Sequence, residues 1–206
     1  MKKFFALVLV LALALSLTAC KEKEIENGGI RDSLAIKSGF RYVEMGFGEY
    51  GKIVIELNFD VAPITANNFY KLVNDGFYDG LTITRAQRDF VIQGGENRSV
   101  SLKPIVGEFR QNGYDNNISH LRGVISMARS NDPDSATSSF FITLADSAKN
   151  SLDGKYAGFG TIVEGMDVVD AIAEDLINAP TSGYLGFVGD SDAITIVYAK
   201  EIQYEK

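Results

Sequence analysis

Hydrophobic and polar positions alternate with a period of two in many short segments of the chain, and this is the pattern of β-strands with one buried face. Residues 40–45 and 53–57 predict two such strands, joined by a glycine-rich turn that contains Gly48 and Gly51. Further short strands are expected around Ile83 and at residues 90–92, 124–127, 140–144, 158–163 and 192–199. Many short strands favour a mainly β fold, closed as an antiparallel barrel.

Two segments instead show the spacing of amphipathic helices. Asp60 is expected to be the N-cap of the first helix and Pro63 to lie in its first turn. Gly76 is a good C-terminal stop. The buried stripe of this helix is expected to contain Ile64, Phe69, Leu72 and Val73. A second helix is predicted from Met166 to about Asp175.

The first twenty residues have the pattern of an export signal. Lys2 and Lys3 are followed by 16 uncharged residues, which is shorter than the ~20 residues that a membrane-spanning helix needs. The segment ends in Leu-Thr-Ala-Cys and resembles a bacterial lipobox. Cys20 is the only cysteine and cannot form an internal disulfide, so we expect residues 1–19 to be a lipoprotein signal peptide and Cys20 to carry palmitate or related lipid.

Residues 20–38 are therefore expected to be a lipidated cysteine and a flexible tether, and residues 39–206 a single folded domain. A lipid anchor holds a protein on the membrane surface, so the expected location is the extracytoplasmic face of the cell membrane. Without the signal, 18 basic residues face 27 acidic ones, a net charge of −9 that argues against nucleic acid as a partner. We expect a monomer.

The residues with the clearest chemical pattern are Arg85, Phe90 and Gln93, followed by Gly94 and Gly95. A cation, a ring and an amide thus follow one another at offsets of five and three, and the alternation from Asp89 to Gln93 is that of a strand. Residues 138–143 add a second apolar segment. No serine paired with a histidine, metal cluster or phosphate loop accompanies them, and His120 is the only histidine. The pattern suits chemistry that breaks no covalent bond, with no metal and no cofactor.

These segments resemble the cyclophilin family of peptidyl-prolyl cis-trans isomerases. The resemblance runs in the family's order from about Phe40 to the C-terminus. It also includes Gly51-Lys52-Ile53-Val54-Ile55-Glu56-Leu57, Pro63-Ile64-Thr65-Ala66-Asn67-Asn68-Phe69, Gly107-Glu108-Phe109, Arg122-Gly123-Val124-Ile125-Ser126-Met127-Ala128 and Leu152-Asp153-Gly154-Lys155-Tyr156-Ala157-Gly158-Phe159-Gly160. It implies a closed eight-stranded antiparallel β-barrel capped by two α-helices, and proline-containing polypeptides as partners.

The resemblance also implies roles for particular residues. Arg85 would stabilise the twisted amide, with Phe90 and Gln93 beside it in the catalytic group. The substrate-binding residues would be Val91, Ala128, Arg129, Ser139, Phe141, Leu152 and Tyr156. Because neighbours on a strand face opposite ways, only one of Phe140 and Phe141 can face the groove, and the family pattern selects Phe141.

Four positions depart from the common family pattern. Ser139 replaces a glutamine, Arg129 an asparagine and Tyr156 a histidine, while Ser151 stands where some members have a tryptophan associated with cyclosporin binding. Arg85 and the apolar positions remain, so we expect isomerase activity on exported or cell-surface proteins and weak binding of cyclosporin. The alternative is a catalytically weak chaperone module that binds proline peptides. A solute-binding lipoprotein would need a longer chain.

Overall fold

The computed structural model describes residues 38–205. The predicted signal peptide, the lipidated Cys20 and all of the tether except Ser38 lie outside the described residues. Within residues 38–205, none of the helices has the length and apolar character needed to cross a membrane.

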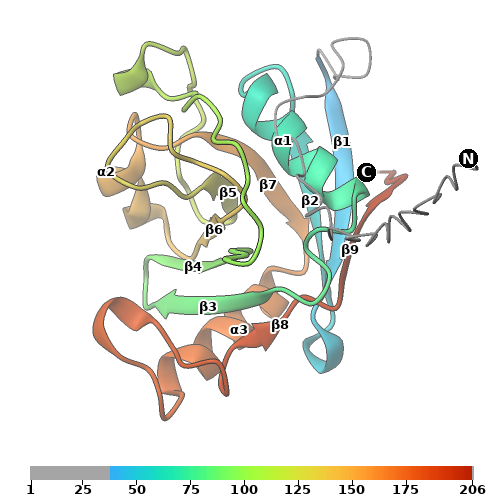
Figure 1. Ribbon diagram of the computed structural model, residues 1–206, viewed down its shortest axis with the longest axis vertical. Coiled ribbons are helices and arrows are strands. Elements are labelled where there is room, and N and C mark those ends of the chain that lie inside the picture. Colours follow the sequence, from blue (N-terminus) through green and yellow to red (C-terminus); the bar gives the residue numbers. More distant parts are fainter. Residues whose placement is uncertain (1–37, 206) are drawn as a thin grey trace, which may run out of the picture.

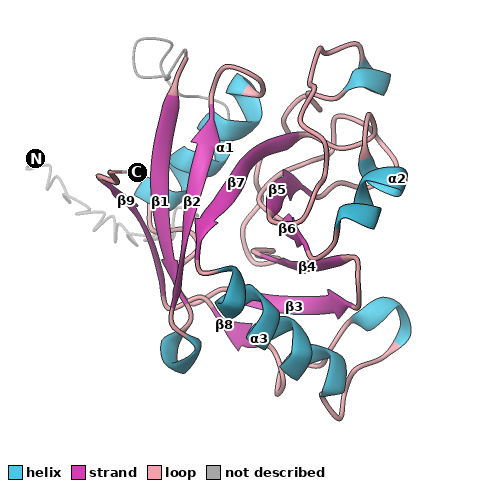
Figure 2. Cartoon of the chain, turned by 180° about the vertical axis from the view of Figure 1, so that it is seen from behind, coloured by secondary structure: helices cyan, strands magenta, loops and turns pink. Residues whose placement is uncertain are grey.

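The described chain forms one curled antiparallel sheet of nine strands, with helices at its margins (Figures 1 and 2). The spatial order is β8-β3-β4-β6-β5-β7-β2-β1-β9. The strands are β1 (Phe40–Gly46), β2 (Lys52–Asn58), β3 (Thr82–Gln87), β4 (Val91–Gly94), β5 (Val124–Met127), β6 (Phe140–Thr143), β7 (Gly158–Glu164), β8 (Ile194–Thr195) and β9 (Tyr198–Ile202).

The predicted closed barrel of eight strands is corrected to this nine-stranded sheet because the last predicted strand is divided. β8 pairs with β3, whereas β9 pairs with β1 at the other end of the strand order. The change of partner occurs between two residues. The Ile196 N–H donates to the Leu81 carbonyl at 2.7 Å, and the Val197 N–H donates to the Gly46 carbonyl at 2.8 Å.

Three α-helices are present where two were predicted: α1 (Pro63–Asn74), α2 (Lys149–Leu152) and α3 (Met166–Asn178). The additional helix, α2, is a single turn and too short for a helical period to show in the sequence. Four short 3₁₀ turns, η1 (Gly48–Tyr50), η2 (Arg110–Asn112), η3 (Asp146–Ala148) and η4 (Tyr184–Gly186), lie in the connections.

The predicted cap of α1 is wrong. Asp60 accepts the Gly39 N–H at 2.9 Å, outside the helix. The first turn of α1 is instead satisfied by Glu108, whose buried carboxylate accepts the N–H groups of Ile64 and Thr65 at 3.1 and 2.7 Å. Ile64 is also not part of the buried stripe, since 40% of it is exposed. A carboxylate from a distant loop has displaced the local cap.

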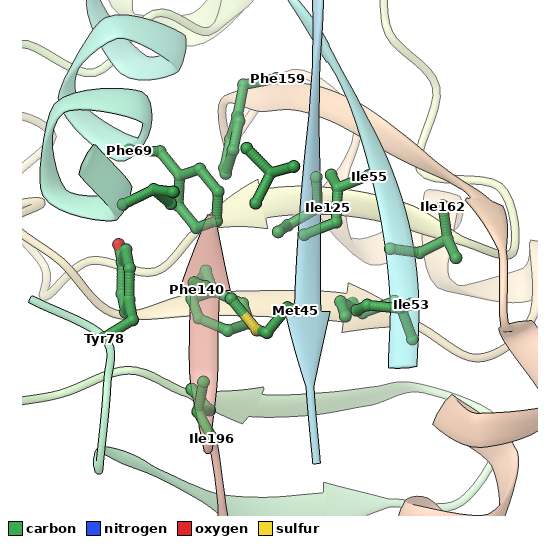
Figure 3. Close-up of a cluster of buried hydrophobic side chains, with 14 of the residues drawn as sticks. Met45, Ile53, Ile55, Phe69, Tyr78, Ile125, Phe140, Phe159, Ile162 and Ile196 are labelled. Atoms are coloured by element: carbon green, nitrogen blue, oxygen red, sulfur yellow. The ribbon is translucent and has the colours of Figure 1, made fainter. Parts of the chain in front are cut away.

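The main core fills the inside of the curled sheet. Figure 3 shows Met45 of β1, Ile53 and Ile55 of β2 and the rings of Phe69, Phe140 and Phe159 within one cluster. Phe69 makes an edge-to-face contact with Phe140 at a centroid distance of 5.7 Å, and the buried Tyr78 hydroxyl donates to the Ser138 carbonyl at 2.9 Å. This core is what holds β3, β4 and β6 in place.

A second, smaller group of apolar residues lies on the other face of β4 and β6. We call it the slot cluster. It consists of the buried residues Val91, Phe141, Ala148 and Leu152 with the partly buried Phe90, Ala128 and Tyr156 packed against them. It is separate from the main core and forms one side of a cleft.

Candidate active site

The cleft beside the slot cluster has a volume of about 320 Å³. Its walls come from β3, β4, β6, α2, the segment after β5 and the loop that contains η4. The lining residues are Arg85, Phe90, Val91, Gln93, Ala128, Arg129, Phe141, Leu152, Tyr156, Leu185 and Phe187. Nine of the ten site residues predicted from the sequence are therefore brought together in one place.

Ser139 is the predicted site residue that does not line the cleft. Its hydroxyl donates to the Gly94 carbonyl at 3.1 Å and lies 3.5 Å from the Gln93 Nε2. Ser139 thus contacts Gln93 and the backbone of β4 without lining the cleft. The short serine side chain leaves Gln93 as the amide that faces the cavity.

Arg85 is held at the centre of the polar wall by the sheet itself. It lies on β3 directly opposite Gln93 of β4, and Gln93 lies opposite Phe141 of β6. The Arg85 Nη1 donates to the Gln93 Oε1 at 2.9 Å and Nη2 to the Gln87 Oε1 at 3.0 Å. Partial burial lowers the pKa of Arg85, and Tyr156 opposes this shift. The guanidinium of Arg85 still remains a cation at neutral pH, because an arginine side chain is not deprotonated in proteins.

A second guanidinium, that of Arg129, also lines the cleft. Its Cζ is 4.9 Å from the centroid of the Phe109 ring and 4.7 Å from that of the Tyr156 ring. It donates to the Lys155 carbonyl at 2.8 and 3.1 Å and to the Ser130 carbonyl at 2.8 Å. Within residues 38–205 neither Arg85 nor Arg129 forms an ion pair with a carboxylate. The cleft is therefore locally cationic in an acidic protein.

The two phenylalanines of β6 face opposite ways. Phe140 is fully buried in the main core, and Phe141 lies in the slot cluster and lines the cleft. The Phe141 ring makes an edge-to-face contact with Tyr156 at a centroid distance of 5.5 Å. Together these rings and Leu152 give the cleft a dry apolar side next to its cationic side.

The ring of His120 supports Phe141 from beneath. The two rings are stacked at a centroid distance of 6.0 Å. The His120 Nδ1 lies 2.9 Å from the Asp153 Oδ1 and Nε2 lies 3.0 Å from the Ser126 Oγ. Burial lowers the pKa of His120, although the hydrogen bond to the Asp153 carboxylate opposes the shift. Ser126 has no exposed surface, so this serine–histidine–aspartate row cannot reach a substrate and acts in packing.

Leu185 and Phe187 are lining residues that sequence reasoning missed. The Leu185 carbonyl accepts the Arg85 Nε–H at 2.8 Å, and the Phe187 ring centroid is 5.2 Å from the Arg85 Cζ. Both follow α3 in a segment with no hydrophobic period. They lie about one hundred positions from Arg85 in the chain, and no local signal connects them to it.

The chemistry that this arrangement allows is narrow. The lining residues contain no serine, threonine, cysteine, histidine or carboxylate. Across residues 38–205 there is also no group of three or more His, Cys, Asp or Glu side chains able to hold a metal ion. A fixed cation beside an apolar slot can bind and polarise a ligand, and the only hydroxyl among the lining residues is that of Tyr156.

Comparison with known proteins agrees with this. Residues 42–192 match the family model described as "Cyclophilin type peptidyl-prolyl cis-trans isomerase/CLD". The chain is 42% identical over 137 residues to a peptidyl-prolyl cis-trans isomerase of Acinetobacter baylyi, a match that covers 65% of this chain and 71% of that protein. It is 41% identical over 127 residues to peptidyl-prolyl cis-trans isomerase A of Dickeya dadantii, covering 60% and 67% of the two chains.

The fold is similar to that of a cyclophilin-type peptidyl-prolyl cis-trans isomerase of Cryptosporidium parvum, whose crystal structure was solved in the presence of the dipeptide Ala-Pro. The TM-score is 0.63 at 24% identity, and the match covers 80% of this chain and all of that one. The chain thus belongs to the cyclophilin family and is a peptidyl-prolyl cis-trans isomerase.

Proposed function

We propose that this isomerase works without covalent chemistry, by stabilising the twisted amide of an X–Pro bond with the guanidinium of Arg85. The barrier to rotation is ~18–20 kcal/mol and arises from resonance between the carbonyl and the prolyl nitrogen. When the bond twists, the nitrogen regains its lone pair and becomes a hydrogen-bond acceptor. An N–H donor aimed at that nitrogen stabilises the transition state more than either ground state.

The proline ring would lie in the slot cluster, against Phe90, Val91, Phe141 and Leu152, with Tyr156 at the rim. Burial of an aliphatic ring contributes ~1.5–3 kcal/mol, enough to hold a substrate without slowing its release. The substrate backbone would bond to Gln93 and to the segment at Ala128 and Arg129. The similar Cryptosporidium protein was solved with Ala-Pro, which supports X–Pro peptides as the ligand class.

The observation that carries this mechanism is the pairing of Arg85 with the slot cluster across one small cleft. It favours catalysis over a passive peptide-binding module, because a module that only binds has no need of a fixed cation beside its apolar slot. The departures at Ser139 and Arg129 leave both halves of the pair intact, so activity is retained.

The test is two-dimensional exchange NMR on a short X–Pro peptide with the parent protein and its Arg85→Ala variant. Loss of a preorganised donor lowers kcat by about 10²–10³-fold, while peptide affinity should change little. Arg88→Ala is the matched control, since Arg88 is an exposed arginine three residues away with an ion pair to Glu174 at 3.4 Å. Equal exchange rates for the parent and Arg85→Ala would contradict the mechanism. Peptide binding without acceleration by the parent would favour the chaperone module.

The cellular setting is part of the same proposal and is supported by the sequence pattern of residues 1–20. The enzyme would be a monomer held by lipid on Cys20 at the extracytoplasmic face of the cell membrane, and its substrates would be exported or cell-surface proteins. Labelling of the whole chain with radioactive palmitate in a bacterial host checks the anchor. The label should appear on the parent and be absent from a Cys20→Ser variant, and equal labelling of both would refute lipidation at this residue.

A further inference from the structure

The loop between α3 and β8, residues 179–193, lies along β3 at the edge of the cleft. Figures 1 and 2 both show it beside the C-terminal end of β3. The contact is made by backbone as well as side chains. Arg85 and Phe187 form an isolated antiparallel bridge, and the Val188 N–H donates to the Thr84 carbonyl at 3.0 Å.

The conformation of this loop is specified by its own residues. Leu185 adopts a left-handed conformation with φ of 60°, and Gly186 follows with φ of 76°. A Cβ at Gly186 would lie 1.9 Å from the Ala86 carbonyl oxygen, so the backbone can approach β3 this closely only with glycine. At the base of the loop, the Thr181 N–H donates to the Asp192 carboxylate at 3.0 Å.

The loop closes the shell of contacts around the Arg85 guanidinium. A guanidinium has five N–H donors in a rigid fork. Gln93, Gln87 and the Leu185 carbonyl accept three of them, and the ring of Phe187 lies 5.2 Å from Cζ. Two donors are then left for a ligand in the cleft, and their direction is set by the other three.

We propose that Leu185 and Phe187 are positioning residues that hold the guanidinium of Arg85 in its catalytic orientation. The proposal rests on the role of Arg85 proposed above. The carbonyl of Leu185 fixes the Nε–H of Arg85, and the Phe187 ring fixes the plane of the guanidinium by a cation–π contact. Because a preorganised donor needs no reorganisation when the amide twists, the loop acts on the rate of rotation and not on peptide affinity.

Phe187 also lines the cleft, with 45% of it exposed, so it could instead contact the substrate. The two roles differ in what they change. A positioning residue alters kcat and leaves KM nearly constant, whereas a residue that binds ground state and transition state equally alters KM.

The experiment compares three variants of the full chain: Phe187→Leu, Phe187→Tyr and Tyr184→Leu. Phe187→Leu keeps an apolar side chain and loses the ring face, while Phe187→Tyr keeps the ring. Tyr184→Leu removes a ring from the same loop at a side chain that is 88% exposed and outside the cleft lining. NMR line shapes of an X–Pro peptide give kcat and KM, and hydrogen exchange of the Arg85 Nε–H reports the orientation of the guanidinium directly.

We expect Phe187→Leu to lower kcat about fivefold, which is the size of one partly exposed cation–π contact, with KM within about twofold of the parent value. The Arg85 Nε–H should exchange faster in this variant. Phe187→Tyr should restore both readouts, and Tyr184→Leu should match the parent.

Three results would overturn the proposal: a rise in KM at constant kcat for Phe187→Leu, an unchanged Nε–H exchange rate, or an equal loss of kcat in Phe187→Tyr. These are distinct from failure of the proposed role of Arg85, which is measured separately by Arg85→Ala. If Arg85→Ala keeps the parent rate, the mechanism fails. If it loses the rate and Phe187→Leu does not, only the positioning role of the loop fails.

Discussion

The main core and the slot cluster meet at β6, where Phe140 belongs to one and Phe141 to the other. The main core is large, aromatic and closed to solvent, whereas the slot cluster has four buried residues and opens into the cleft. The same strand therefore contributes to the main core with one face and lines the cleft with the other. Truncation of Phe140 and truncation of Phe141 should therefore have different effects, although the two residues are adjacent and of the same type.

The largest effect is expected for Phe140→Ala. The ring is fully buried and makes edge-to-face contacts with Phe69 and Tyr78, each at 5.7 Å between centroids. Removal of a ring from a closed core lowers the free energy of unfolding by about 3–5 kcal/mol. Urea denaturation followed by circular dichroism measures this loss. A loss smaller than that of Phe141→Ala would erase the distinction between the two clusters.

Phe141→Ala is expected to act mainly on activity. It removes one wall of the slot, so kcat/KM should fall about 10- to 100-fold, which corresponds to the burial of one proline ring. The free energy of unfolding should fall less than in Phe140→Ala, because a cavity beside an open cleft can be filled by water. Exchange NMR gives kcat/KM, and denaturation of the same preparation gives the free energy of unfolding. An unchanged kcat/KM in Phe141→Ala would contradict the assignment of Phe141 to the binding slot.

The slot could also be extended from α2. Ser151 is exposed and directly precedes Leu152, which lines the cleft. Ser151→Trp should tighten cyclosporin binding by about tenfold through added aromatic contact, while the parent protein binds the drug weakly. Asn150→Trp, one residue earlier on the same turn, is the control. Calorimetric titration checks both, and nanomolar affinity of the parent would contradict the expectation.

The smallest effect expected concerns pH, and it should affect the slot cluster before the main sheet. Burial lowers the pKa of His120 below 6.5, so its stabilising contribution is complete above that pH and is lost as the pH falls toward the lowered value. Glu44 of β1 has a pKa lowered from 4.5 to about 2, chiefly by the hydrogen bond from Lys52, so its contribution is lost between those values.

Denaturation at a series of pH values should therefore show two separate steps. His120→Gln should remove the step below pH 6.5, and Glu44→Gln should weaken the step below pH 4.5. A single step near pH 4, unaffected by His120→Gln, would show that the histidine beneath the slot does not couple to folding.

Much of the sheet could be predicted from the sequence because the period of two is a local property. It separates Phe140 from Phe141, and the predicted strands at residues 124–127 and 140–144 agree with β5 and β6. The site residues could be found as a group because the family resemblance supplies their order along the chain. Arg85, Gln93 and Phe141 then meet through strand pairing, across a distance that no window of sequence covers.

The parts that could not be predicted depend on partners far away in the chain. Asp60 is of a residue type that often caps helices, yet the first N–H groups of α1 are bound by Glu108, more than forty residues away in the chain. Leu185 and Phe187 contact Arg85 from a loop that has no hydrophobic periodicity. The last predicted strand is divided because the N–H groups of Ile196 and Val197 bond to opposite ends of the sheet. Tertiary contacts decided these three features.

The pairing of β9 with β1 has a consequence for how the enzyme itself is made. Tyr42 lies opposite Ile202, so contacts that finish the sheet join residues about 160 positions apart. Chains dominated by such distant contacts fold slowly, since a long loop must close before the contact forms. During synthesis, β1 would therefore lack its last neighbour until β9 has been made. The sheet is thus completed late in folding, by a contact between two strands that are far apart in the sequence.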